Sequence, residues 1–146
     1  MTAINHINAN DIALVDLYGD MDVYQSTATM SAIYPGRASP LGMIYVALKL
    51  NGEAGEIAEH VGKAMRDDNL MGEVDVNNGR CDWHMGPDLT PSRRELLVKE
   101  VGDCLWYLAA MCNELDITLT EAAVTNLKKL KDRQERGTLQ GSGDRR

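Results

Sequence analysis

Two long helical patterns that carry paired carboxylates constrain the fold of this chain more than any other feature. They span residues 40–66 and 92–115, and apolar residues recur in both at about 100° per residue. The first stripe comprises Ala54, Ile57, Ala58, Val61 and Met65, and the second comprises Leu97, Val101, Cys104, Leu105, Leu108, Cys112 and Leu115. This periodicity predicts two amphipathic helices that pack on each other through their stripes.

Helix-start signals divide the chain further. Pro40 follows a serine and suits the first turn of a helix, where its missing N–H is not needed. Ser92 with Glu95, and Thr118 with Glu121, are both capping boxes, in which the first residue caps the helix. We therefore expect helices to begin near these three positions.

Two more helices complete a predicted set of four, one over about 10–33 and one from Thr118 to near Gly137. Phe is absent and aromatic residues are 5% of the chain, a composition that favours helices over sheets. The fold class is therefore predicted to be all-α, a four-helix bundle in a single domain, 1–146. Residues 69–91 are too long for a bare connector, and Asn78-Gly79 could turn a small hairpin there. The glycine-rich tail 137–146 is not expected to be helical.

The composition also excludes several classes of function. A net charge of −7 opposes nonspecific binding to polymeric nucleic acid. No apolar run is long enough for a membrane span, and no secretory signal pattern opens the sequence. The three cysteines are an odd number, and Cys104 and Cys112 lie in an apolar stripe, which favours free thiols in a reducing compartment. A cytoplasmic protein is expected.

The paired carboxylates are the predicted centre of chemistry. Glu53 and Glu56 are three residues apart on one helix face, and Glu100 and Asp103 have the same spacing and offset on the other helix. Packed antiparallel, the helices bring all four together, although each pair of anions about 4 Å apart would cost about 4 kcal/mol at an effective dielectric near 20. Divalent cations such as Mg²⁺ remove that cost. One such pair alone is more often a solvated helix face.

Glycine inside a helix needs a separate explanation. Gly52, Gly55 and Gly102 adjoin these carboxylates, and each weakens the helix by about 1 kcal/mol relative to alanine. We interpret them as positions at which a backbone or a ligand approaches closely, beside a metal-filled crevice.

The motifs resemble those of the MazG-like family of all-α nucleoside triphosphate pyrophosphohydrolases. The similarity covers most of the chain, and its signature is E-x-x-E followed by E-x-x-D. It lies in YQ (24–25), AIYP (32–35), LKLNGEAGEIAEHVGKAMRD (48–67), KEVGDCLWYLAAM (99–111) and NLKKLKDRQERGTLQGSGDRR (126–146). Residues 69–91 are an insertion relative to the usual family pattern.

The resemblance implies hydrolysis of a nucleoside triphosphate to the monophosphate and pyrophosphate. Glu53, Glu56, Glu100 and Asp103 match the family's catalytic metal ligands, for two or three Mg²⁺ ions per site with Mn²⁺ as a substitute. Glu59 is either a further ligand or a solvent-facing residue. The base stays open: dGTP or GTP in nucleotide-pool control is one reading, and dCTP, dUTP or phosphoribosyl-ATP are others.

The same resemblance assigns substrate-binding residues. Asn126, Lys129 and Arg133 match an N-x-x-K-x-x-x-R pattern on one helix face and would contact phosphates, although a solvated helix end explains them equally by composition. Tyr107 and Lys63 are further expected contacts.

Assembly and competing functions follow from the same comparison. The family implies a homo-oligomer, a dimer or a homotetramer built as a dimer of dimers, with Trp106 at an interface. The competing readings are a non-catalytic helical module that binds nucleotide without turnover and a purely structural helical oligomer. Retention of all four carboxylates argues against both.

Overall fold

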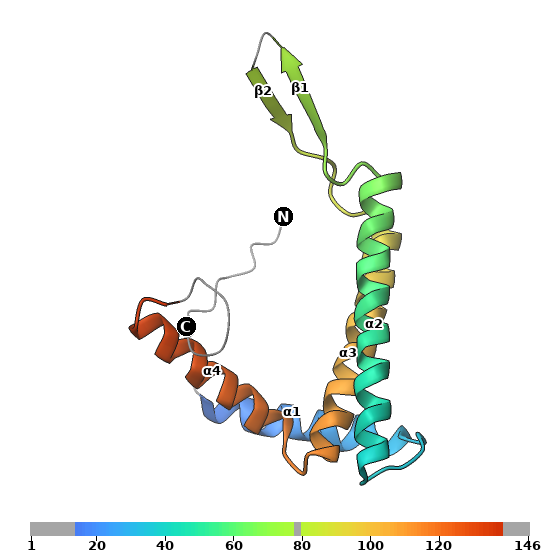
Figure 1. The fold of residues 1–146 in the computed structure, drawn as a ribbon, viewed down its shortest axis with the longest axis vertical. Coiled ribbons are helices and arrows are strands. Elements are labelled where there is room, and N and C mark those ends of the chain that lie inside the picture. The colour runs from blue at the N-terminus through green and yellow to red at the C-terminus, as the bar shows by residue number, and fades with distance from the viewer. Residues whose placement is uncertain (1–13, 78–79, 139–146) are drawn as a thin grey trace. The chain divides into compact units, whose positions relative to one another are not determined.

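The protein is described by a computed structural model that covers residues 14–77 and 80–138. Its elements are α1 (Leu14–Ala28), the 3₁₀ helix η1 (Thr29–Ser31), α2 (Pro40–Asp67), β1 (Glu73–Asn77), β2 (Arg80–His84), α3 (Pro91–Glu114) and α4 (Leu119–Glu135), as Figure 1 shows. The prediction of an all-α fold is confirmed, with one small hairpin added. Among these residues no helix combines the length and the apolar character that crossing a membrane requires.

The chain forms two compact units. One joins the N-terminal residues up to Met43 with those from Ala109 onward, and the other is Ile44–Leu108. The second unit contains most of α2 and α3, which lie side by side (Figure 1). Their contacts pair Asp68 with Arg93 near one end and His60 with Glu100 further along, so the two helices run antiparallel as predicted.

Helix boundaries follow the expected signals with one exception. α2 begins at Pro40, and the Thr118 side chain caps α4 by accepting the Glu121 N–H at 3.0 Å. The cap predicted for α3 is wrong, because the helix begins at Pro91 and the Thr90 hydroxyl accepts the N–H of Arg93 at 3.3 Å. Threonine followed by proline supplies both a cap and a preorganised first turn, and this signal prevails over the capping box two residues later.

The expected hairpin lies within the segment 69–91. β1 and β2 pair antiparallel, with Glu73 opposite His84 and Asn77 opposite Arg80. The turn residues themselves, Asn78 and Gly79, lie outside the described residues, as do residues 10–13 of the first predicted helix and 139–146 of the tail. At the base of the hairpin Arg93 bridges Asp68 at 2.8 Å and Asp67 at 3.5 Å.

A buried amide fixes the first unit. The Gln25 side chain on α1 accepts the Leu119 N–H at 2.6 Å and donates to Asn113 at 2.7 Å and to the Ile117 carbonyl at 3.1 Å. A small core of Ala109, Cys112 and Leu119 packs beside it. Gln25 therefore links α1 to the end of α3 and the start of α4, and all its hydrogen-bonding capacity toward these segments is structural.

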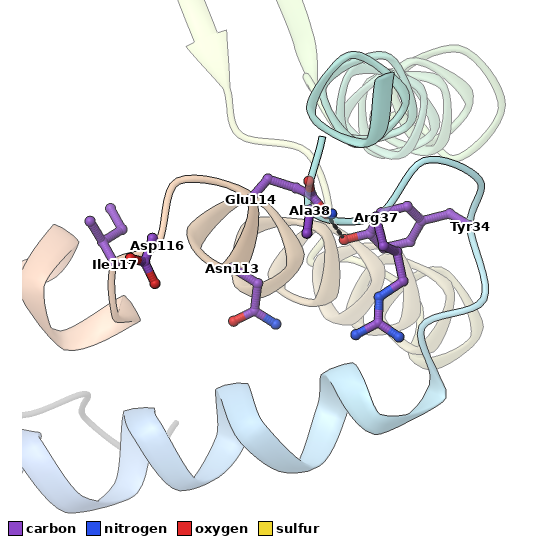
Figure 2. A pocket seen from close by; sticks show the side chains of 7 residues that line it. All are labelled: Tyr34, Arg37, Ala38, Asn113, Glu114, Asp116 and Ile117. Carbon is purple, nitrogen blue, oxygen red and sulfur yellow. Dashed lines mark hydrogen bonds between the residues drawn. The ribbon is translucent and has the colours of Figure 1, made fainter. Parts of the chain in front are cut away.

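The turn between η1 and α2 closes around Glu114. Its Oε1 accepts the Tyr34 hydroxyl at 2.5 Å and the Ala38 N–H at 3.3 Å, and burial together with this carboxylate raises the pKa of Tyr34 to about 12. Gly42 is required here, since a Cβ would collide with the Gly36 carbonyl and with Oε2 of Glu114. A cavity of about 300 Å³ beside this turn is lined by Tyr34, Arg37, Ala38, Asn113, Glu114, Asp116 and Ile117 (Figure 2).

The predicted packing of α2 on α3 through their apolar stripes is wrong. On α2 the buried residues of the second unit are Val46, Glu53 and Ala64, whereas Met65 of the predicted stripe is 44% exposed. On α3, Val101, Leu105 and Leu108 are 55%, 39% and 43% exposed. The sequence period marks an apolar face, but it does not tell whether the chain itself or another molecule covers that face.

The helix glycines change meaning with this geometry. A Cβ built at Gly52, Gly55 or Gly102 would meet nothing within 4 Å, so none of the three lines a filled crevice within the chain. The interpretation that they admit a close approach inside the chain is therefore wrong. Solvent-facing glycine inside a helix has no benefit in the isolated chain.

Candidate active site

Three of the four predicted metal ligands come together between α2 and α3. Glu53, Glu100 and Asp103 each offer a carboxylate oxygen within 4.8 Å of those of the other two. The side chains of Glu53 and Glu100 are each only 12% exposed, whereas Asp103 is exposed. The group therefore has two shielded anions and one that faces solvent.

Glu56 and Glu59 lie outside this group. Both are exposed, and Glu59 forms an ion pair with Lys63 at 2.6 Å, which lowers the pKa of the Glu59 carboxyl. Of the two readings left open for Glu59, this pairing favours the solvent-facing one. The same ion pair engages Lys63, one of the predicted substrate contacts.

Two basic side chains on α2 accompany the carboxylates, and the sequence analysis missed both. The Lys49 ammonium lies 3.4 Å from Oε1 of Glu53, and Nε2 of His60 lies 3.7 Å from Oε1 of Glu100. Their spacing contains the signal, because positions 49, 53 and 60 recur at i, i+4 and i+11 on one helix face.

The electrostatics of the group extend to its neighbours. Hydrogen bonding to Glu53, strengthened by charge interactions, raises the pKa of Lys49, and its ammonium lies 5.9 Å from the centre of the Tyr107 ring. Burial raises the pKa of the Tyr107 hydroxyl. Burial, reinforced by Glu53, Asp103 and Glu100, also raises the pKa of the Cys104 thiol, which keeps this sulfur protonated beside the carboxylates. Trp106 packs edge-on against Tyr107, with ring centres 4.9 Å apart.

The donor set fits a hard divalent cation. All three members are carboxylates, the ligand type that Mg²⁺ and Mn²⁺ prefer, and ligand oxygens around Mg²⁺ lie about 2.1 Å from the ion. Opposite ligands are then about 4.2 Å apart, slightly less than the 4.8 Å limit within which these oxygens lie. Cations would also offset the repulsion between Glu53 and Glu100, whose shielding from water strengthens it. The group could thus hold a divalent metal.

The predicted phosphate contacts belong to α4, in the first unit. Asn126 and Lys129 are exposed and line a shallow cavity of about 420 Å³ with Ile117, Glu121, Ala122 and Thr125. Arg133 is 5% exposed, which is unusual for a guanidinium. Its burial differs from the solvated helix end that composition alone would suggest.

Comparison with known proteins assigns the family. The profile of the MazG nucleotide pyrophosphohydrolase domain matches residues 45–138, which include all four predicted ligands and the three α4 residues. The chain belongs to the MazG nucleotide pyrophosphohydrolase family. It is also 40% identical over 129 residues to the Gene 37 protein of Mycobacterium phage L5, an alignment that covers 86% of this chain and 98% of that protein. No solved structure gives a significant match.

Membership defines the enzyme class. MazG domains are nucleoside triphosphate pyrophosphohydrolases, so this chain is an enzyme that hydrolyses nucleotides with release of pyrophosphate. The acidic group between α2 and α3 suits that class, because such enzymes generally depend on divalent metals and the group could hold one.

Proposed function

We propose that this MazG protein hydrolyses a (deoxy)nucleoside triphosphate at the α-phosphorus, giving the monophosphate and pyrophosphate, with Mg²⁺ as the metal and Mn²⁺ as a substitute. The observation that carries the proposal is the convergence of Glu53, Glu100 and Asp103 between two helices. Bound ions would neutralise the triphosphate and supply an activated water. Carboxylates gathered without a cation would only destabilise this region.

The residues of the chain have separate tasks in this proposal. Glu53, Glu100 and Asp103 hold the metal ions, and Glu56 joins them through the family motif. Asn126, Lys129 and Arg133 bind phosphate oxygens and offset the charge of the departing pyrophosphate. Tyr107 and Lys63 contribute further contacts to the triphosphate. Two or three ions per site are expected.

For the substrate, we propose dGTP or GTP as the first candidate, within control of the nucleotide pool. Pyrophosphohydrolysis of dCTP, dUTP or phosphoribosyl-ATP would use the same metal group. The free thiols of Cys104 and Cys112 suit a reducing compartment such as the cytoplasm.

The deciding experiment is a panel of ribo- and deoxynucleoside triphosphates with Mg²⁺ or Mn²⁺, with pyrophosphate and monophosphate measured separately. We expect equal amounts of both products, one preferred base, and no turnover in EDTA. Stepwise release of inorganic phosphate would contradict attack at the α-phosphorus. Nucleotide binding without turnover by any substrate would favour the non-catalytic module instead.

We also propose that the working form is a homo-oligomer, a dimer or a tetramer. The support is an apolar surface on the second unit, made of Ile44, Leu48, Met65, Val98, Val101, Leu105 and Leu108, with exposures from 39% to 69%. Exposed apolar clusters of this kind mark protein interfaces. Gly52, Gly55 and Gly102, which have open space in the single chain, would allow a second copy to approach closely.

A further inference from the structure

His60 is a polar side chain in a place where the proposed reaction gives it no task. It lies on α2 with 16% of its side chain exposed, and its Nε2 atom is 3.7 Å from Oε1 of Glu100. Glu100 is itself only 12% exposed. An imidazole and a carboxylate thus face each other in a region largely shielded from water.

A direct ligand role does not fit this geometry. The oxygens of Glu53, Glu100 and Asp103 satisfy a mutual 4.8 Å limit, and among the described residues no imidazole nitrogen joins them. His60 therefore lies beside the metal group and contacts it through a single member.

A simple packing role fits no better. Filling a half-buried helix position with an imidazole is unfavourable unless its nitrogens are hydrogen-bonded, and an aliphatic side chain would avoid that penalty. The Nδ1 atom is buried and has no hydrogen-bond partner within the described ranges. What the ring can offer to its surroundings is an Nε2–H donor directed at Glu100.

Lys49 provides a parallel on the same helix face. It supports Glu53 at 3.4 Å, as His60 faces Glu100 at 3.7 Å, so each shielded carboxylate has one basic neighbour from α2. Metal-ligating carboxylates are commonly fixed in this way by hydrogen bonds from residues that do not touch the metal.

We propose that His60 is a positioning residue for the metal site: its Nε2–H donates to Oε1 of Glu100 and leaves the second carboxylate oxygen for the cation. The inference rests on the proposed function, because it requires that Glu100 bind metal. Shortening the 3.7 Å separation to hydrogen-bond length takes less than about 1 Å of movement.

The test is Mn²⁺ binding to the full chain, measured by electron paramagnetic resonance for the wild type and for His60→Leu, His60→Gln and His60→Asn. Gln places a donor near the position of Nε2, whereas Asn is too short and Leu has none. We expect Leu and Asn to weaken Mn²⁺ binding by about 10-fold or more, and Gln to stay within about 3-fold of the wild type. Half-maximal pyrophosphate release should shift to higher Mg²⁺ concentration in the same order, with kcat at saturating Mg²⁺ retained.

Glu100→Gln is the control that separates this inference from the proposed function. If Glu100→Gln loses Mn²⁺ binding but His60→Leu binds like the wild type, the positioning role is wrong and the metal site stands. If Glu100→Gln also binds normally, the metal site is wrong and the inference falls with it. Should His60→Leu fail to fold by circular dichroism, the Gln and Asn variants decide, and equal binding by those two overturns the proposal.

Discussion

At the scale of single residues, Asp103 offers the sharpest test of the metal group. It is the exposed member, so Asp103→Asn removes charge without disturbing a buried contact. We expect turnover to fall by more than about 100-fold, since even supporting residues around a metal account for 10- to 100-fold. The metal-free variant should unfold at the same or a higher temperature, because repulsion with Glu53 and Glu100 is relieved.

Glu56→Gln is the companion variant in the same assay of pyrophosphate release. The family motif includes Glu56, whereas the structure keeps it outside the group of three. A similar loss in both variants supports four working carboxylates, and a loss in Asp103→Asn alone restricts the site to three. Near-normal turnover in Asp103→Asn would contradict the metal site.

Tyr34 gives a residue-scale prediction for pH. Its pKa is about 12 in the folded chain against 10.0 in the unfolded chain, since burial and Glu114 both disfavour the phenolate. The folded state therefore holds the proton more tightly, and this contribution to stability is complete below about pH 10 and lost as the pH rises to about 12. In urea titrations at pH 9 to 12, Tyr34→Phe should lose less stability over this interval than the wild type. Parallel curves for the two proteins would contradict this assignment.

At the scale of elements, the Gln25 amide joins three segments and sets the geometry of the first unit. Gln25→Leu keeps the volume similar but leaves the buried Leu119 N–H and the Asn113 amide without their partner. We expect a loss of about 2–4 kcal/mol in the free energy of unfolding, as an unsatisfied buried polar group costs about 1–3 kcal/mol. Urea denaturation measures this. Ser26→Ala, which removes only an exposed bond to Val23, should change stability by less than about 0.5 kcal/mol.

The same elements show how far the sequence predicts the fold. Local signals placed α2 at Pro40 and the cap of α4 at Thr118, because a cap depends on residues that are neighbours in sequence. At α3 two local signals competed, and the Thr90-Pro91 pair prevailed over Ser92. The bonds from Gln25 to Asn113 and Leu119 join segments about 90 residues apart, and no local pattern encodes them.

The candidate site was predictable to a similar degree. The spacing of Glu53, Glu100 and Asp103 placed them on facing sides of an antiparallel pair, and the structure brings them together. Lys49 and His60 were missed although they share the helix face of Glu53, since a lysine or histidine near a carboxylate is common on any helix. Only the distances between helices single them out.

At the scale of the whole molecule, the apolar surface of the second unit demands a partner. Few apolar side chains of the described residues are buried, whereas Leu48, Val98 and Val101 are 69%, 56% and 55% exposed. Each buried aliphatic side chain contributes about 1.5–3 kcal/mol when removed from water. An isolated chain would therefore forgo a large part of the stabilisation that its sequence offers, and a second copy covering this surface would restore it.

Leu105→Glu tests this directly, because it places a charge in the centre of that surface. Light scattering after size exclusion should show the wild type as a dimer or tetramer and the variant as a smaller species. The melting temperature of the wild type should rise with protein concentration, as it does when folding is linked to association, and that of the variant should be lower and independent of concentration. Lys128→Glu, an exposed charge reversal on α4, should assemble and melt as the wild type does. A wild type that is monomeric and melts independently of concentration would mean that something other than a second copy covers this surface.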